Sequence, residues 1–176
     1  MKYTLRAGQL SEKDSGHTLA RLRGTIPGQS RQVSGEDGGL LLRTEVRLLE
    51  SSGLRPCDVR LREYVMLTVD GETLAIARPG YSEHDDPDVC GWPANHMPRV
   101  DHAALYFGGR GHMLVMRSAM RYELLSQGGA LEVSIDHRGL AGGWDIEADD
   151  GISAAFLLGL FSFCRYMERE NGSVCV

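Results

Sequence analysis

Residues 152–167, with the sequence ISAAFLLGLFSFCRYM, constrain the fold more than any other stretch of this chain. A surface helix carries apolar residues on one stripe, but here Phe156 and Leu160 would lie on one side of a helix while Leu157 and Phe161 fill other sides. The segment would be roughly 24 Å long as a helix, which is short of the ~30 Å hydrocarbon core of a membrane. We therefore predict a helix that the rest of the chain encloses.

Turn-forming and capping residues lie at both ends of this stretch. Residues 149–151 are Asp-Asp-Gly, which can cap a helix N-terminus, and Asn171-Gly172 predicts a left-handed stop. Arg165 is the one Lys or Arg within residues 152–167. We expect its side chain to leave the core near the helix C-terminus, where a positive charge is favoured.

The length of 176 residues predicts a single domain over residues 1–176. An apolar fraction of 42% and a charged fraction of 24% are typical of globular proteins. Residues 1–16 lack the apolar core of a signal peptide, so we expect a cytoplasmic protein that is not transmembrane. The four cysteines show no CxxC pair, and we expect them to be reduced.

Short runs of alternating apolar and polar residues, separated by glycine-bearing turns, precede residue 150. Asp70-Gly71, between two such runs, is the strongest hairpin signal. About eleven antiparallel strands around one apolar helix imply a closed barrel, because closure removes sheet edges and buries the helix. The expected strands are residues 3–7, 17–23, 31–33, 40–49, 59–69, 73–78, 102–107, 112–117, 121–125, 131–137 and 143–146.

This order of elements resembles a known fold. The hairpins YVMLTVDGETLAIA and YELLSQGGALEVSI, followed by ISAAFLLGLFSFCRYMEREN, resemble the tubby C-terminal-like fold of tubby-like proteins, LURP-one-related proteins and phospholipid scramblases. The segments GWPANHMPRVDHA, HRGLAGGW and FCRYMEREN look like those of small bacterial tubby-like proteins. The resemblance implies a closed β-barrel of about twelve strands around a C-terminal helix. It also implies binding of an anionic phospholipid, since tubby itself binds phosphoinositides.

Arginines recur at alternating positions in the first half of the chain. Residues 1–62 hold 11 Lys and Arg against 7 Asp and Glu, although the whole chain has a net charge of −5. If Leu22, Val46 and Leu61 point inward, the flanking arginines point outward and form one basic panel. The members of this expected panel are Arg21, Arg23, Arg43, Arg47, Arg60 and Arg62.

This panel leads us to predict a non-enzymatic binding protein whose ligand is an anionic lipid headgroup or another phosphorylated molecule. Guanidinium groups match phosphate oxygens in bidentate fashion. Such a protein would be cytoplasmic and peripheral at the membrane, with no nucleic-acid partner and no cofactor. A solvated basic face without a ligand is the alternative interpretation of the same arginines.

The long irregular stretch at residues 80–101 supports two other hypotheses. As a binding loop it would contact a protein partner, and as a structural element it would plug the barrel. Its His84, Asp86, Cys90 and His96 offer ligands of the kinds that zinc accepts, so a metal-dependent hydrolase is a further alternative. These four residues match no known ligand spacing, and no nucleophile–base motif or phosphate-binding glycine loop is visible. We therefore expect no catalytic residues and no metal site.

Overall fold

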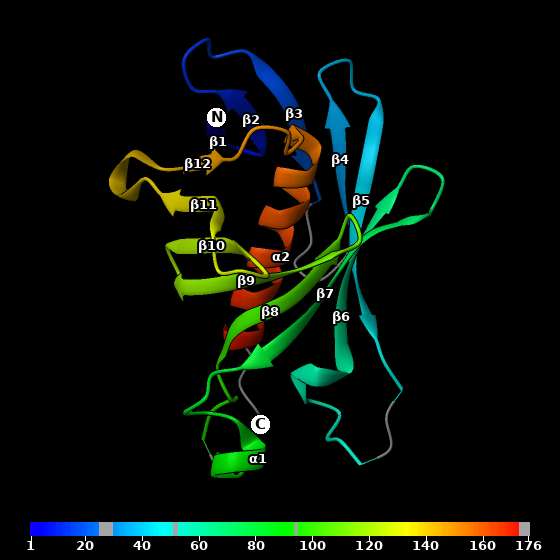
Figure 1. Ribbon diagram of the computed structural model, residues 1–176, viewed down its shortest axis with the longest axis vertical. Helices are drawn as coiled ribbons and strands as arrows, with labels where there is room; N and C mark the ends of the chain where they lie inside the picture. The colour runs from blue at the N-terminus through cyan, green and yellow to red at the C-terminus, as the bar shows by residue number, and fades with distance from the viewer. Residues whose placement is uncertain (25–29, 51–52, 94, 173–176) are drawn as a thin grey trace.

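Twelve antiparallel strands close into a single barrel, and the one long helix runs through it (Figure 1). The structure is a computed structural model, and it describes residues 1–24, 30–50, 53–93 and 95–172. Each strand pairs with its neighbour in the sequence, and the barrel closes where β1 pairs with β12. The barrel and the C-terminal helix predicted from the sequence are therefore confirmed.

The strands are short, as the spacing of the glycine-bearing turns predicts. Two 3-10 helices, a one-turn helix and the long C-terminal helix complete the described elements. Their bounds in chain order are β1 Lys2–Arg6, β2 Gln9–Glu12, β3 Thr18–Arg23, β4 Arg31–Gly35, β5 Leu40–Leu48, η1 Val59–Leu61, β6 Arg62–Thr68, β7 Thr73–Tyr81, α1 Pro87–Cys90, β8 Val100–Phe107, β9 Arg110–Ser118, β10 Arg121–Ser126, β11 Leu131–His137, η2 Gly139–Ala141, β12 Trp144–Ala148 and α2 Ala154–Gly172.

The sequence prediction missed β2 and extended β6 too far. Strand β2 has only four residues, of which Leu10 alone is buried, so no alternating run marks it. Residues 59–61, which we expected to begin a strand, form η1 instead, because the Asp58 side chain accepts a hydrogen bond from the backbone N–H of Arg60 and caps a helical turn.

Helix α2 is the core around which the barrel is built. Every residue from Phe156 to Cys164 is buried, so the helix has no exposed face along its central turns. Ser153 caps the helix N-terminus by accepting a hydrogen bond from Phe156 N at 3.2 Å. The cap therefore lies two residues beyond the Asp-Asp-Gly segment from which we expected it.

The C-terminal end of α2 differs from the expected stop. Asn171 and Gly172 remain helical, and the Asn171 side chain bonds both backbone groups of Val100. Its Oδ1 accepts from Val100 N at 2.7 Å, and its Nδ2 donates to Val100 O at 2.9 Å. Asn171 thus ties the helix end to the start of β8.

Side chains on the inner faces of the strands pack directly on α2. On β6, Tyr64 stacks at an angle on Phe163, and Met66 lies against Gly159, where an added Cβ would come within 2.8 Å of the Met66 sulfur. Inside the barrel the Tyr166 hydroxyl and the Thr44 hydroxyl form a hydrogen bond of 2.9 Å. This buried polar pair links α2 to β5.

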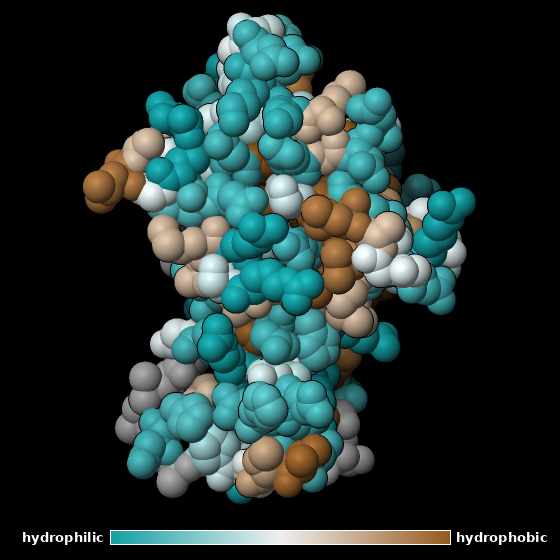
Figure 2. Space-filling model, turned by 60° about the vertical axis from the view of Figure 1, so that its left-hand side comes forward, coloured by the Kyte–Doolittle hydropathy of each residue, from teal (hydrophilic) through white to brown (hydrophobic). Residues whose placement is uncertain are grey.

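The face of the molecule drawn in Figure 2 is mainly hydrophilic. On the face drawn in Figure 2, apolar residues form only small separate patches among polar ones. Within the described residues, no helix combines the length and the apolar character needed to cross a membrane.

Candidate functional site

Three of the six predicted arginines lie together on the outer face of β3, β4 and β5. The register places Arg23 opposite Gln32, and Gln32 opposite Arg43, so these side chains form one row across the three strands. Their neighbours Leu22 and Leu42 face inward. Arg23 and Arg43 are exposed, and strand spacing puts their Cα atoms about 10 Å apart, close enough for both to contact one ligand. We call Arg21, Arg23 and Arg43 the arginine face.

The arginine face makes no ion pair with any residue in the described ranges. Arg21 lies opposite Ser34 in the next row, and both residues carry a buried hydrogen-bonding atom that has no partner among the described residues. These atoms are Arg21 Nε and Ser34 Oγ, and Ser34 is only 5% exposed. Two buried donors without an acceptor are unfavourable, and both lie next to the row that carries Arg23 and Arg43. The groups that an outside ligand can reach are the exposed guanidinium groups of Arg23 and Arg43.

Arg31, at the start of β4, is a basic residue that our sequence reasoning did not include. Its guanidinium lies 5.6 Å from the centroid of the Tyr166 ring, on the inner side of the barrel. Burial lowers the pKa of Arg31 from its ordinary value, and the nearby positive charge of Arg165 adds to this effect. Arg31 lies two positions before the inward-facing Val33 on β4, so strict alternation along the strand would have predicted an inward side chain. Its pairing partner on β5 is the buried Thr44.

Arg47 points outward as predicted, but it is paired within its own strand. Its Nε donates to Glu45 Oε1 at 2.8 Å. This contact neutralises Glu45, the one acidic residue that the sequence places between the arginines of β5. Arg47 is consequently less available to a ligand than Arg43.

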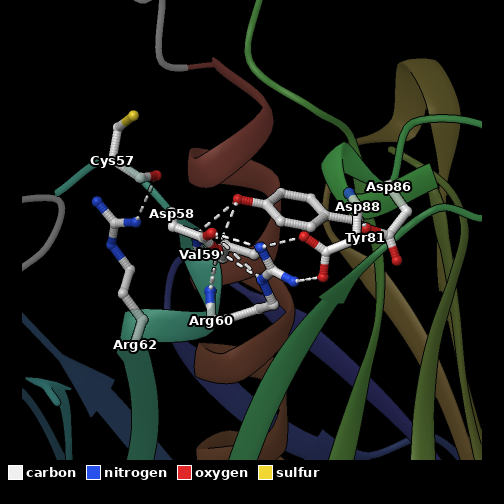
Figure 3. Close-up of polar contacts among 8 residues, drawn as sticks. All are labelled: Cys57, Asp58, Val59, Arg60, Arg62, Tyr81, Asp86 and Asp88. Atoms are coloured by element: carbon white, nitrogen blue, oxygen red, sulfur yellow. Dashed lines mark hydrogen bonds and ion pairs between the residues drawn. The ribbon is translucent and has the colours of Figure 1, made fainter. Parts of the chain in front are cut away.

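Arg60 is held in a polar cluster with Asp58, Tyr81 and Asp88 (Figure 3). Its Nη2 donates to Asp58 Oδ2 at 2.7 Å, its Nε donates to Asp58 Oδ1 at 3.0 Å, and its other end pairs with Asp88. The Tyr81 hydroxyl also donates to Asp58, at 3.1 Å, while it accepts from Val59 N. The cluster fastens the segment before β6 to the end of β7 and to α1.

The charges in this cluster stabilise one another. Burial alone would raise the pKa of Asp58, but the hydrogen bonds from Arg60 and Tyr81 outweigh it and lower the pKa below its usual value. The hydrogen bonds to Asp58 and Asp88 raise the pKa of Arg60. Asp58 is 1% exposed and fully engaged, so the arrangement is that of a structural ion pair.

Arg62 lies on the inner side of its strand, contrary to our prediction. It shares its side of β6 with Tyr64 and Met66, because η1 ends at Leu61 and the alternation of the strand begins only at Arg62. Its Nε lies 3.3 Å from Glu170 Oε1 on α2. The six-member basic panel expected from the sequence is therefore reduced to the arginine face, with Arg47 at its side.

The loop at residues 80–101 does not gather the four candidate metal ligands into one set. Asp86 caps α1, Cys90 Sγ donates to the carbonyl oxygen of His84, and His96 pairs with Asp85 at 3.6 Å. No group of three or more His, Cys, Asp or Glu side chains in the described parts of the chain is placed to hold a metal ion.

The same loop covers the barrel end at the C-terminus of α2. Trp92 packs edge-on against Tyr81 and lies under the guanidinium of Arg55, at 5.1 Å from its ring centroid. A cavity of about 430 Å³ remains between the loop and the helix end, lined in part by Asp85, Arg99 and Glu168. Its mixed charges do not select a ligand of either sign.

Comparison with known proteins gave no match: no family model, no curated protein and no solved structure is significantly similar to this chain. The closed barrel with a C-terminal helix is established by the structure, and it is compatible with a tubby-like barrel. Membership of the tubby C-terminal-like family remains a prediction from the sequence.

Proposed function

We propose that this protein is a non-enzymatic binding protein that takes a phosphate group at the arginine face. The phosphate belongs to an anionic lipid headgroup or to a soluble phosphorylated ligand, and the chemistry of recognition is the same for both. The observation that carries the proposal is the row on which Arg23 and Arg43 lie exposed on either side of Gln32, where no described carboxylate neutralises them. Guanidinium groups on adjacent strands can donate to several phosphate oxygens at once.

The resemblance to tubby-like, LURP-one-related and scramblase proteins supports the same ligand class by analogy. If the ligand is a lipid, the protein would be cytoplasmic and peripheral at the membrane. The alternative is a scaffold that binds a protein partner through the loop at residues 80–101. It is favoured by the exposure of Val89, which is 75% exposed on α1 within that loop.

Vesicle co-sedimentation and calorimetry test the proposal. The vesicles contain phosphatidylcholine alone, or with phosphatidylserine or phosphatidylinositol bisphosphate, and the soluble probe is inositol trisphosphate. Each basic residue near an anionic surface contributes about 1 kcal/mol, so Arg23→Gln with Arg43→Gln should weaken binding by about 2 kcal/mol, or roughly 30-fold. Added salt should weaken binding by the wild-type protein.

Arg117→Gln with Arg121→Gln is the matched control, since both arginines are half exposed and pair with Glu123 on another part of the barrel. The control should bind like the wild type. Binding to vesicles alone would identify a lipid surface, and binding to inositol trisphosphate alone would identify a soluble ligand. Binding to neither probe, or equal effects of the two double variants, would refute the phosphate site and leave the protein-partner alternative.

A further inference from the structure

A second candidate site lies on the outer face of β7, β8 and β9. A groove of about 570 Å³ occupies this face, within the range of about 300–1,000 Å³ that is usual for small-molecule sites. Its floor is formed by two rows of outward-facing residues that the strand register places side by side. One row is Arg78, Ala104 and Met113, and the other is Ile76, Tyr106 and Gly111.

The groove exists because small and large side chains alternate across these rows. Ala104 and Gly111 leave a depression, while Tyr106 and Met113 rise on either side of it and are 58% and 37% exposed. The turn after β10 adds Gln127 to the lining. An exposed aromatic and a thioether beside a depression provide apolar contact area that no described residue covers.

A single charged group marks one end of the groove. Among the described residues, Arg78 is the one Lys, Arg, Asp or Glu side chain in the lining, and it is 67% exposed. Its Nε donates to Glu63 Oε2 at 3.1 Å, which fixes the guanidinium, whereas its terminal nitrogens donate to no described residue. Two parallel N–H donors in this position match a carboxylate in bidentate fashion.

We propose that this groove binds a small amphiphile with one carboxylate, such as a medium-chain fatty acid. The apolar body would lie over Ala104 and Gly111 between Tyr106 and Met113, and the carboxylate would accept hydrogen bonds from the terminal nitrogens of Arg78. The site is separate from the arginine face and does not depend on the proposed phosphate ligand.

Fluorescence titration tests this site, with 11-(dansylamino)undecanoate as the reporter and decanoate or decanol as the competitor. Gly111→Leu should abolish reporter binding without disturbing the fold, because Gly111 has no left-handed φ and an added Cβ would meet no atom within 4 Å. Arg78→Gln should weaken decanoate about tenfold or more, as expected for loss of hydrogen bonds to a charged group, and should leave decanol unchanged.

Two matched variants serve as controls. Gly172→Leu also adds a side chain where a Cβ meets nothing, and Arg117→Gln also removes an outward arginine that pairs with a glutamate. Both should bind the reporter like the wild type, and circular dichroism should show all variants folded. No reporter binding up to about 1 mM, the weak end of specific affinities, would overturn the proposal. Reporter binding that is unaffected by Gly111→Leu would also overturn it. So would a dimeric wild type that Gly111→Leu converts to a monomer, because the groove would then be a subunit interface.

Discussion

Replacing Asp58 by alanine is expected to lower the free energy of unfolding by about 3–5 kcal/mol, the cost of removing one partner from a buried ion pair. Asp58 is 1% exposed and accepts five hydrogen bonds between 2.7 and 3.2 Å, four from Arg60 and one from Tyr81. Hydrogen bonds to charged groups contribute about 1.5–3 kcal/mol each, but these converge on one carboxylate, three of them from one guanidinium, and are not additive. In Asp58→Ala the Arg60 guanidinium still pairs with Asp88, which limits the loss of stability.

Urea denaturation of the wild type, Asp58→Ala and Asp88→Ala measures this effect. Asp88 binds the same guanidinium from a side chain that is 69% exposed, so Asp88→Ala should cost only about 0–1 kcal/mol. The comparison separates burial from charge, because both variants remove one carboxylate from Arg60.

The pH dependence provides a second readout of the same contact. The pKa of Asp58 is lowered in the folded protein from the unfolded value of 3.8. The stabilisation that the Asp58 carboxylate contributes to folding is therefore fully present above pH 3.8, and it is lost as the pH falls through the folded pKa. The unfolding free energies of the wild type and Asp58→Ala should therefore converge in strong acid. An Asp58→Ala cost no greater than that of Asp88→Ala, or a cost independent of pH, would refute this account of the cluster.

Two further contacts should also be measurable. Thr44→Val should lower the free energy of unfolding by about 0.5–1.5 kcal/mol, because it removes the hydrogen bond between the two buried hydroxyl groups while the Tyr166 hydroxyl still donates to the Thr44 carbonyl oxygen. A variant as stable as the wild type in thermal unfolding would contradict this expectation. Asn171→Ala should cost about 1–3 kcal/mol and speed hydrogen exchange at Val100 N, whose acceptor is the Asn171 side chain; unchanged exchange there would argue against the link between α2 and β8.

The enclosed helix and the closed barrel around it were predicted correctly. The enclosed helix followed from residues 156–164, because no arrangement of those side chains leaves a polar face. The closed barrel then followed from the need to surround that helix with strands. The helix cap was misplaced because Asp149, Asp150 and Ser153 are all good capping residues, and only the geometry shows that Ser153 accepts the bond from Phe156.

The candidate site was only partly predictable, because the partner of an arginine is set by long-range contacts. Arg60 meets Asp88 across 28 positions of sequence, and Arg62 meets Glu170 at the far end of the chain. Alternation placed Arg23 and Arg43 correctly on the outer face, since their strands are regular. The unpartnered atoms of Arg21 and Ser34 could not have been found from the sequence, because their burial depends on the neighbouring strands.

The position of α2 in the chain has a consequence for how the protein is made. Every strand of the barrel is synthesised before the helix that fills its interior, and β1 must wait for β12 before the sheet can close. Until then, inward side chains such as Tyr64 and Leu114, both fully buried in the finished protein, have no partner on α2 or across the barrel. Nascent chains with exposed apolar surfaces and open strand edges are prone to aggregate, and long-range strand pairing is slow. Folding of the barrel is therefore completed only after α2 has been synthesised, and the inward side chains of the strands lack their helix partner until then.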